Sequence, residues 1–218
     1  MLKPVASREI ELLANRYPVL APLEEDIVSC VQMLKDCYCR GNKILVCGNG
    51  GSAADSLHIV GELMKSFTLK RRLPEELRQR IREECGEAAP DYIENLQRAI
   101  PALALVSETA LITAYANDNA ADFAIAQQVL GYGKPGDVLI AISTSGNSAN
   151  VLHAARIAKV AGVKVISLTG EGGGKLGGLS DVCIAVPSCI TYQIQELHLP
   201  VYHCICLALE AELFSEEE

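Results

Sequence analysis

The sequence predicts an α/β fold, a three-layer α-β-α sandwich built on a doubly wound parallel sheet. Short apolar segments, among them residues 44–47 and 182–186, alternate with segments of helical periodicity after residue 40. Strands that are apolar throughout are typical of parallel sheets covered on both faces. Strands joined by helices need right-handed crossovers, which put helices on both faces of the sheet. The composition agrees, because half of the residues are hydrophobic, only 5% are aromatic and there is no Trp.

The elements are expected in a simple order within one domain that covers residues 1–218. Two helices precede the first strand, at residues 10–15 and 23–40, and we expect residues 1–40 to serve contact between subunits. The expected strands are residues 44–47, 102–106, 137–142, 163–168 and 182–186. The helices that follow them are expected after residue 51 and at residues 110–116, 122–132, 149–161 and about 192–214.

The helix after the first strand carries the most informative stretch. The strand runs into the tight turn Gly-Asn-Gly-Gly at residues 48–51, and Ser52 or Asp55 is expected to cap the helix that opens there. A stripe of apolar and small residues at helical spacing is expected to pack on the core. Its members are Leu57, Val60, Gly61 and Met64.

Charge, apolar runs and cysteine usage exclude several classes. A net charge of -8 argues against nucleic-acid binding, because there is no basic surplus to displace counterions. No stretch is expected to reach the roughly 18 to 20 apolar residues that span a membrane. Residues 1–11 show no targeting pattern, and a cytoplasmic location is expected. The nine cysteines contain no C-x-x-C pair and are expected to be buried, reduced thiols.

Residues 65–98 differ in composition from the rest of the chain. They are rich in basic and acidic residues that nearly balance. Pro74 is placed to start a helix that ends before Gly86, and Pro90 is placed to start a second one. We expect a charged, solvated helical insertion, with a lid that closes over the site as the alternative.

Two Gly/Ser-rich turns indicate an anion site. Each turn, at residues 48–52 and 143–148, follows a predicted strand and opens a helix, where backbone N–H groups and the positive helix end gather an anion. The second turn adds four hydroxyls. They belong to Ser143, Thr144, Ser145 and Ser148. A phosphate monoester is the expected ligand.

No nucleotide cofactor is expected. Residues 48–53 fit the relaxed G-x-G-x-x-A pattern of dinucleotide sites, a pattern that is common by chance. The second strand with an acidic residue about twenty positions later is missing. Only Arg71 or Arg72, as a partner for a 2'-phosphate, keeps that alternative open.

Four polar residues on two helices form a further constellation. His58 and Glu62 are four residues apart, so they share a helix face just behind the glycine turn. Gln195 and His203 are eight apart and lie within about a quarter turn of the same face. Pro200 between them is expected to kink the last helix or make it restart. The other two histidines, His153 and His198, are expected to be packing residues.

Together these motifs resemble the SIS (sugar isomerase) fold, and within it the phosphoheptose (sedoheptulose 7-phosphate) isomerase family. The resemblance covers most of the chain apart from residues 65–98. The matching motifs are Cys-Gly-Asn-Gly-Gly-Ser at 47–52, His-x-x-x-Glu at 58–62, Ala-Asn-Asp at 116–118, Ile-Ser-Thr-Ser-Gly-Asn-Ser at 142–148, Leu-Thr-Gly-x-x-Gly-Gly at 168–174 and Ile-Gln-Glu-x-His-x-x-x-x-His at 194–203.

The resemblance implies a phosphosugar substrate and a homotetramer whose active sites lie between subunits. It implies that the phosphate is held by Ser52, Ser143, Thr144, Ser145 and Ser148. It implies that the sugar is bound by Asn49, Gly50, Gly51, Asn117, Asp118 and Gln195. It also implies a zinc ion bound by His58, Glu62, Gln195 and His203.

The reaction implied is aldose–ketose isomerisation through an enediol(ate), converting sedoheptulose 7-phosphate to D-glycero-D-manno-heptose 7-phosphate. Glu62 would be the base that carries a proton between C1 and C2, and His203 the acid that acts on the oxygens. Zinc or Gln195 would polarise the carbonyl. The alternatives are an isomerase of another phosphosugar, or a non-catalytic paralogue that binds a phosphosugar or a protein partner, as a partner of the bacterial replication initiator does.

Overall fold

Five parallel strands form the centre of the computed structural model, which describes residues 1–215. They are β1 (Ile44–Cys47), β2 (Ala102–Ala104), β3 (Val138–Ser143), β4 (Lys164–Thr169) and β5 (Val182–Ala185). Their order across the sheet is β2-β1-β3-β4-β5, and every neighbouring pair is parallel. The chain leaves β1 toward β2 on one side and returns to β3 on the other, so a topological switch point lies between β1 and β3. The predicted doubly wound sheet is confirmed.

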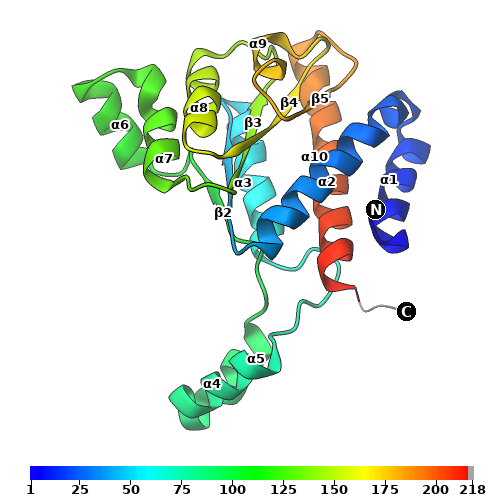
Figure 1. Ribbon diagram of the computed structural model, residues 1–218, viewed down its shortest axis with the longest axis vertical. Coiled ribbons are helices and arrows are strands. Elements are labelled where there is room, and N and C mark those ends of the chain that lie inside the picture. Colours follow the sequence, from blue (N-terminus) through cyan, green and yellow to red (C-terminus); the bar gives the residue numbers. More distant parts are fainter. Residues whose placement is uncertain (216–218) are drawn as a thin grey trace.

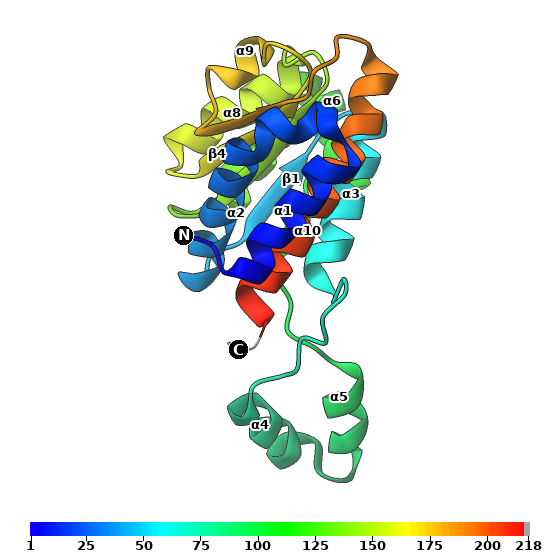
Figure 2. The same cartoon turned by 90° about the vertical axis from the view of Figure 1, so that its right-hand side faces the viewer.

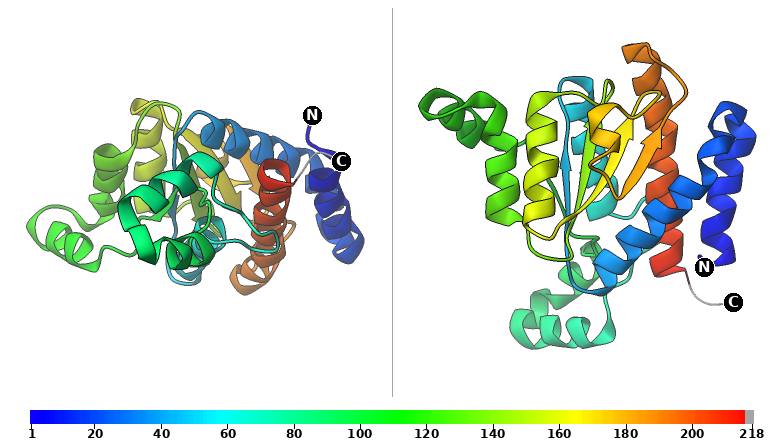
Figure 3. Two further views of the ribbon diagram at one scale, coloured as in Figure 1. Left: turned by 90° about the horizontal axis from the view of Figure 1, so that it is seen from below. Right: turned by 45° about the horizontal axis from the view of Figure 1, so that its top comes forward.

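Helices cover both faces of this sheet because successive strand residues point to opposite sides. Ile44 and Val46 of β1 enter a core shared with α1 (Pro4–Arg16), α2 (Glu24–Cys39), α3 (Gly51–Met64) and α10 (Thr191–Phe214). Leu45 and Cys47 enter a second core against α7 (Ala124–Tyr132) and α8 (Ala149–Val160). Figure 3 shows these helix layers on either side of the strands.

Short elements complete the chain. They are the 3₁₀ turns η1 (Pro18–Leu23), η2 (Gly86–Ala88) and η3 (Ala121–Phe123), and the helices α4 (Glu75–Cys85), α5 (Ala89–Asn95), α6 (Thr109–Asp118) and α9 (Gly174–Gly177). All nine cysteines are free thiols. Five of them are buried, whereas Cys39 and Cys189 are exposed. Burial raises the pKa of Cys47 to about 12, which makes that thiol unreactive near neutral pH.

The helix α3 differs from its sequence-based prediction in two ways. It begins at Gly51, and the residue before it, Gly50, has φ +54°. No side chain caps this helix start, so neither Ser52 nor Asp55 does. The predicted apolar stripe is also wrong, because Leu57 and Met64 are 51% and 46% exposed. The face that packs lies about one residue, or roughly 100°, further round the helix. It consists of Ser52, Ser56, Ile59, Glu62 and Leu63.

The last helix, α10, is continuous through Pro200. The predicted restart is therefore wrong: a proline costs about 3 kcal/mol inside a helix, but Ile194 and Val201 on either side are buried in the core and hold both halves in line. By length and mean hydropathy α10 resembles a membrane-spanning helix, but 61% of its most apolar 18 residues is buried within the fold, as in a core helix.

The segment 65–98 has two structurally distinct parts. No residue of α4 is buried, and α4 and α5 project as a hairpin beyond the end of the sheet opposite α9 (Figures 1 and 2). In this arrangement the hairpin does not cover the Gly/Ser-rich turns of the same chain, because those turns lie at the far end. The base of the insertion is not solvated, since Arg71 is buried against α10.

Candidate active site

The two Gly/Ser-rich turns meet at the switch point of the sheet, as ligand-binding turns of doubly wound folds do. One follows β1 and the other follows β3, the two strands that neighbour each other there. Asn49 in the first turn and Asn150 at the start of α8 exchange two hydrogen bonds, each 2.8 Å long. This amide pair joins the two turns at their mouths.

The turn at residues 143–148 is closed by hydroxyls and by one glycine. The hydroxyl oxygens of Ser143 and Ser148 are 3.0 Å apart, and the Ser145 hydroxyl accepts the backbone N–H of Asn147. Gly146 has φ +62°, and an added Cβ would lie 2.1 Å from the carbonyl oxygen of Gly173. Only glycine fits there. The hydroxyls of Ser143, Ser145 and Ser148 therefore lie directly before α8. The Val151 N–H at this helix start already donates to Asn150 Oδ1, which leaves the N–H groups of residues 149 and 150 for an anion.

The amino end of α3 lies against Gln195. A Cβ added at Gly51 would stand 2.5 Å from the Gln195 Nε2 atom, so the side chain of Gln195 occupies the space that this glycine leaves. Gln195 thus lies with the predicted sugar-binding residues of the first turn. It is about 12 Å along α10 from His203, since a helix rises about 1.5 Å per residue. The structure does not bring Gln195 to the other three predicted zinc ligands.

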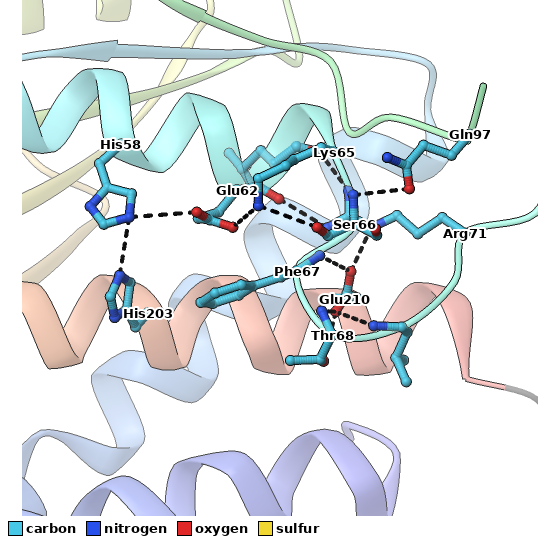
Figure 4. Close-up of polar contacts among 12 residues, drawn as sticks. His58, Glu62, Lys65, Ser66, Phe67, Thr68, Arg71, Gln97, His203 and Glu210 are labelled. Atoms are coloured by element: carbon cyan, nitrogen blue, oxygen red, sulfur yellow. Dashed lines mark hydrogen bonds and ion pairs between the residues drawn. The ribbon is translucent and has the colours of Figure 1, made fainter. Parts of the chain in front are cut away.

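Those three side chains, His58, Glu62 and His203, do come together (Figure 4). The Nε2 atom of His58 lies 3.5 Å from Glu62 Oε1 and 3.4 Å from His203 Nε2. His58 and Glu62 share one face of α3, and His203 faces them from α10. The two predicted catalytic groups are therefore both within 3.5 Å of a single imidazole nitrogen.

Glu62 and His203 have different electrostatic surroundings. The second oxygen of Glu62 pairs with Lys65 Nζ at 2.6 Å, and the Glu62 side chain is only 11% exposed. Burial lowers the pKa of His203 below its ordinary value, and the nearby His58 lowers it further, while Glu62 acts in the opposite direction. His203 is accordingly a neutral imidazole near pH 7.

A polar chain lies behind His58, and the sequence did not predict it. The Tyr202 hydroxyl lies 3.0 Å from His58 Nδ1 and donates to Asp55 Oδ1 at 3.3 Å. Burial raises the pKa of Asp55, while Tyr202 and His58 act to lower it. Asp55 lies three residues before His58, so helical spacing was the signal available for finding Asp55, whereas Tyr202 had no such signal.

A second unpredicted feature joins the ends of the two site helices. Arg71 donates through Nη1 to the Leu63 carbonyl at 2.6 Å and through Nη2 to the Glu62 carbonyl at 3.0 Å, which satisfies orphan carbonyls at the end of α3. Its Nε atom donates to Glu210 Oε1 at 2.7 Å, and both side chains are fully buried. Arg71 is thus unavailable for a nucleotide 2'-phosphate.

Other predicted site residues lie apart from the cluster. Asn117 and Asp118 end α6, a helix with no buried residue that projects from the sheet (Figure 1), and their side chains hydrogen-bond to each other. His153 stacks on Phe123. His198 is fully buried with Nε2 3.1 Å from the Thr169 carbonyl, the position of a packing residue.

The donor distances at His58 fit a zinc ion. Two ligands at the usual 2.0–2.1 Å from a tetrahedral zinc stand about 3.4 Å apart, which matches the spacings from His58 Nε2 to His203 and Glu62. The fit is limited to these two spacings, because within residues 1–215 no three such side chains converge as a ready-made metal-binding group. His58, Glu62 and His203 are the donors available for one.

The doubly wound sheet and the two turns at its switch point define an α/β protein with an anion-binding site, and comparisons with known proteins give its family. Residues 85–170 match the SIS domain family. The chain is 37% identical to the phosphoheptose isomerase of Shewanella sp. (strain ANA-3) over 221 aligned residues, which cover 100% of this chain and 99% of the relative. This chain belongs to the phosphoheptose isomerase family, a family of aldose–ketose isomerases.

Two solved structures support the same assignment. The phosphoheptose isomerase of Neisseria gonorrhoeae superposes with a TM-score of 0.71 at 32% identity, covering 94% of this chain and 93% of that one. The enzyme of Francisella tularensis superposes with a TM-score of 0.70 at 30% identity, covering 93% and 92%.

Proposed function

We propose that this chain interconverts sedoheptulose 7-phosphate and D-glycero-D-manno-heptose 7-phosphate by moving a proton between C1 and C2 through an enediol(ate). One observation carries the proposal for the site: the Glu62 carboxylate and the neutral His203 imidazole flank His58 Nε2. Glu62 lies on α3, which starts at the first Gly/Ser-rich turn, and His203 lies on α10, which passes beside that turn. Aldose–ketose isomerisation needs a base at carbon and a proton donor at oxygen, and these two groups provide them.

The phosphate is bound at the joined turns. The hydroxyls of residues 143–148 and the N–H groups at the start of α8 supply donors for its oxygens. Asn49 reaches this region through its amide pair with Asn150, and Ser52, buried in the first turn of α3, is proposed to donate from there. Gly50, Gly51 and Gln195 then border the sugar, so the chain of the substrate extends from the turns along α3 toward Glu62.

Glu62 removes the proton from the carbon next to the carbonyl and returns it to the neighbouring carbon. Its Oε2 atom is fixed by Lys65, which leaves Oε1 on the side of His58 and His203. His203 moves protons at the two oxygens. A glutamate base with a neutral histidine is also the pair that triosephosphate isomerase uses for a related reaction, because a neutral imidazole matches the acidity of the enediol oxygens better than an imidazolium.

A zinc ion held by His58, Glu62 and His203 is part of the proposal. When bound, zinc would polarise the substrate carbonyl as a Lewis acid. Support comes from the ligand spacings and from the chemistry of two imidazoles and a carboxylate, which is a common catalytic zinc set. In this proposal Gln195 binds the sugar, since its amide lies at Gly51.

The proposal includes a cytoplasmic homotetramer with sites between subunits. Support comes from the exposed apolar side chains of Leu57, Met64 and Leu199, which lie on the two site helices. Burying such side chains against another copy removes apolar surface from water, the usual source of subunit association. Asn117 and Asp118 are proposed to line the sugar in that assembly.

The test is isomerisation of sedoheptulose 7-phosphate by the zinc-supplemented protein and its variants. Glu62→Gln and His203→Ala should each lower kcat by about 10²-fold or more, the usual value of a proton-transfer role. Matched controls are Glu84→Gln on the exposed helix α4 and His153→Gln, which should keep wild-type rates. Full activity in Glu62→Gln would contradict the assignment of the base.

A further inference from the structure

A chain of three polar groups, centred on the buried Tyr202, ends at His58, whose side chain is 44% exposed. Tyr202 is 2% exposed, and its single hydroxyl lies between Asp55 Oδ1 at 3.3 Å and His58 Nδ1 at 3.0 Å. The rings of Tyr202 and His58 meet edge to face with centroids 5.5 Å apart, so the imidazole plane is held by packing as well as by the hydrogen bond.

We propose that Asp55 and Tyr202 are positioning residues that hold His58 in the Nδ1–H tautomer, with the lone pair of Nε2 directed between Glu62 and His203. The inference rests on the proposed function for its consequence, because it concerns the imidazole that both catalytic groups flank. Asp55 and Tyr202 thereby gain a role in holding His58, although neither residue takes part in the proton transfers of the isomerisation.

The direction of each hydrogen bond follows from the number of protons. A tyrosine hydroxyl has one proton, and an ionised carboxylate can only accept. The Tyr202 proton therefore goes to Asp55, and the Tyr202 oxygen accepts from His58 Nδ1–H. Nε2 is then the unprotonated nitrogen of the ring.

The opposite tautomer leaves protons badly placed. Its Nε2–H would point to Glu62 Oε1 at 3.5 Å, beyond the usual range of an N–H···O hydrogen bond. Nδ1 would then take the Tyr202 proton, and Asp55 would lose its donor. The other oxygen, Asp55 Oδ2, is already buried without a partner among the described residues, so the carboxylate would have none.

The consequence concerns what Nε2 can bind. A free lone pair on Nε2 faces His203 Nε2, 3.4 Å away, and can ligate a metal ion. Histidines that ligate metals commonly donate their other N–H to a fixed acceptor, and loss of that acceptor typically costs 10–100-fold in metal affinity or activity. Tyr202 is that acceptor here.

The first test reads the tautomer directly. Metal-free protein labelled with ¹⁵N in histidine is studied by long-range ¹H–¹⁵N correlation above pH 7, with the His58 signals assigned by their loss in His58→Gln. We expect Nδ1–H in the wild type and a loss of that preference in Tyr202→Phe. His58 found as Nε2–H in the wild type overturns the proposal.

The second test measures zinc affinity by competition with a chelator. Tyr202→Phe should bind zinc 10–100-fold more weakly, whereas Tyr38→Phe, which removes a hydroxyl that accepts from Arg98 instead, should be unchanged. Equal affinities in wild type and Tyr202→Phe overturn the proposal. If Tyr202→Phe does not fold, Asp55→Ala replaces it, since it removes the acceptor of the Tyr202 hydroxyl.

Neither readout needs turnover. A wild-type protein that shows Nδ1–H and the expected zinc affinities but isomerises no sugar would refute the proposed function and leave the tautomer assignment standing. An enzyme that isomerises the sugar but holds His58 in the Nε2–H tautomer would refute the tautomer assignment and leave the proposed function standing.

Discussion

Replacing Glu210 by Ala should destabilise the fold far more than removing any surface carboxylate. Glu210 accepts five hydrogen bonds, from the backbone N–H groups of residues 67–69, the Thr68 hydroxyl and Arg71 Nε. Its loss leaves the buried guanidinium of Arg71 without a counter-charge and three N–H groups without an acceptor. Breaking a buried ion pair from one side costs about 3–5 kcal/mol, a large part of a typical unfolding free energy of about 5–15 kcal/mol.

Urea unfolding followed by circular dichroism at one fixed protein concentration measures this cost. The matched control is Glu75→Ala, which removes a carboxylate that pairs with Arg78 and Arg82 on the surface of α4 and should shift the midpoint little. Because Arg71 also holds the end of α3, kcat should fall along with stability. Equal midpoints for Glu210→Ala and Glu75→Ala would refute the reasoning.

The same site gives a pH dependence with a definite sign. Burial alone would raise the pKa of Glu210, but the backbone N–H groups of residues 67–69 and the Arg71 side chain outweigh it, so the pKa in the folded state lies below the usual 4.5. A lowered folded-state pKa stabilises the protein above the unfolded-state value, and this contribution is lost as pH falls through the folded-state value. The difference in stability between wild type and Glu210→Ala should therefore shrink below about pH 4.5.

The remaining predictions concern the phosphate turn and the assembly. Gly146→Ala should weaken binding of the phosphosugar by about 10-fold or more, since overpacking by one methyl group costs roughly 1–3 kcal/mol. Gly172→Ala is the control in titration calorimetry, because Gly172 also has a positive φ, +79°, but an added Cβ there meets nothing within 4 Å; equal affinities would contradict the steric argument. Light scattering after size exclusion should give the mass of four chains for the wild type and a smaller species for Leu57→Asp, and a wild-type monomer would contradict the proposed tetramer.

Most of the fold could be predicted because its signals are local. The strand at residues 44–47 is apolar on both faces and bounded by glycines, and the turn at residues 143–148 has a composition that few other elements use. Parallel pairing then follows from the alternation of strands and helices. The two turns therefore fell at the switch point without knowledge of any contact.

What the sequence could not reveal depends on contacts between distant residues. The packing face of α3 was predicted from apolarity, whereas the structure buries Ser52 and Ser56 there, because Ser56 satisfies its hydroxyl on the Ser52 carbonyl within the helix. Arg71 and Glu210 are separated by 139 positions. Arg71 was therefore indistinguishable from its solvated neighbour Arg72 until the tertiary structure placed it.

The candidate site was predictable in its residue types and not in its shape. His58, Glu62 and His203 were expected together from helical spacing and from the family resemblance. Gln195 was expected with them, and its amide lies at Gly51, about 12 Å along α10 from His203. Tyr202 carried no sequence signal of its own, as an aromatic residue in an apolar helix is usually only part of a core.

Glu62 is proposed to carry a proton between C1 and C2 of a phosphosugar. This role is tested by proton NMR of sedoheptulose 7-phosphate in D₂O, with zinc-supplemented protein and with Glu62→Gln. Deuterium should enter next to the carbonyl while aldose phosphate appears, and Glu62→Gln should give neither. Aldose formation or exchange that persists at the wild-type rate in Glu62→Gln would contradict this role.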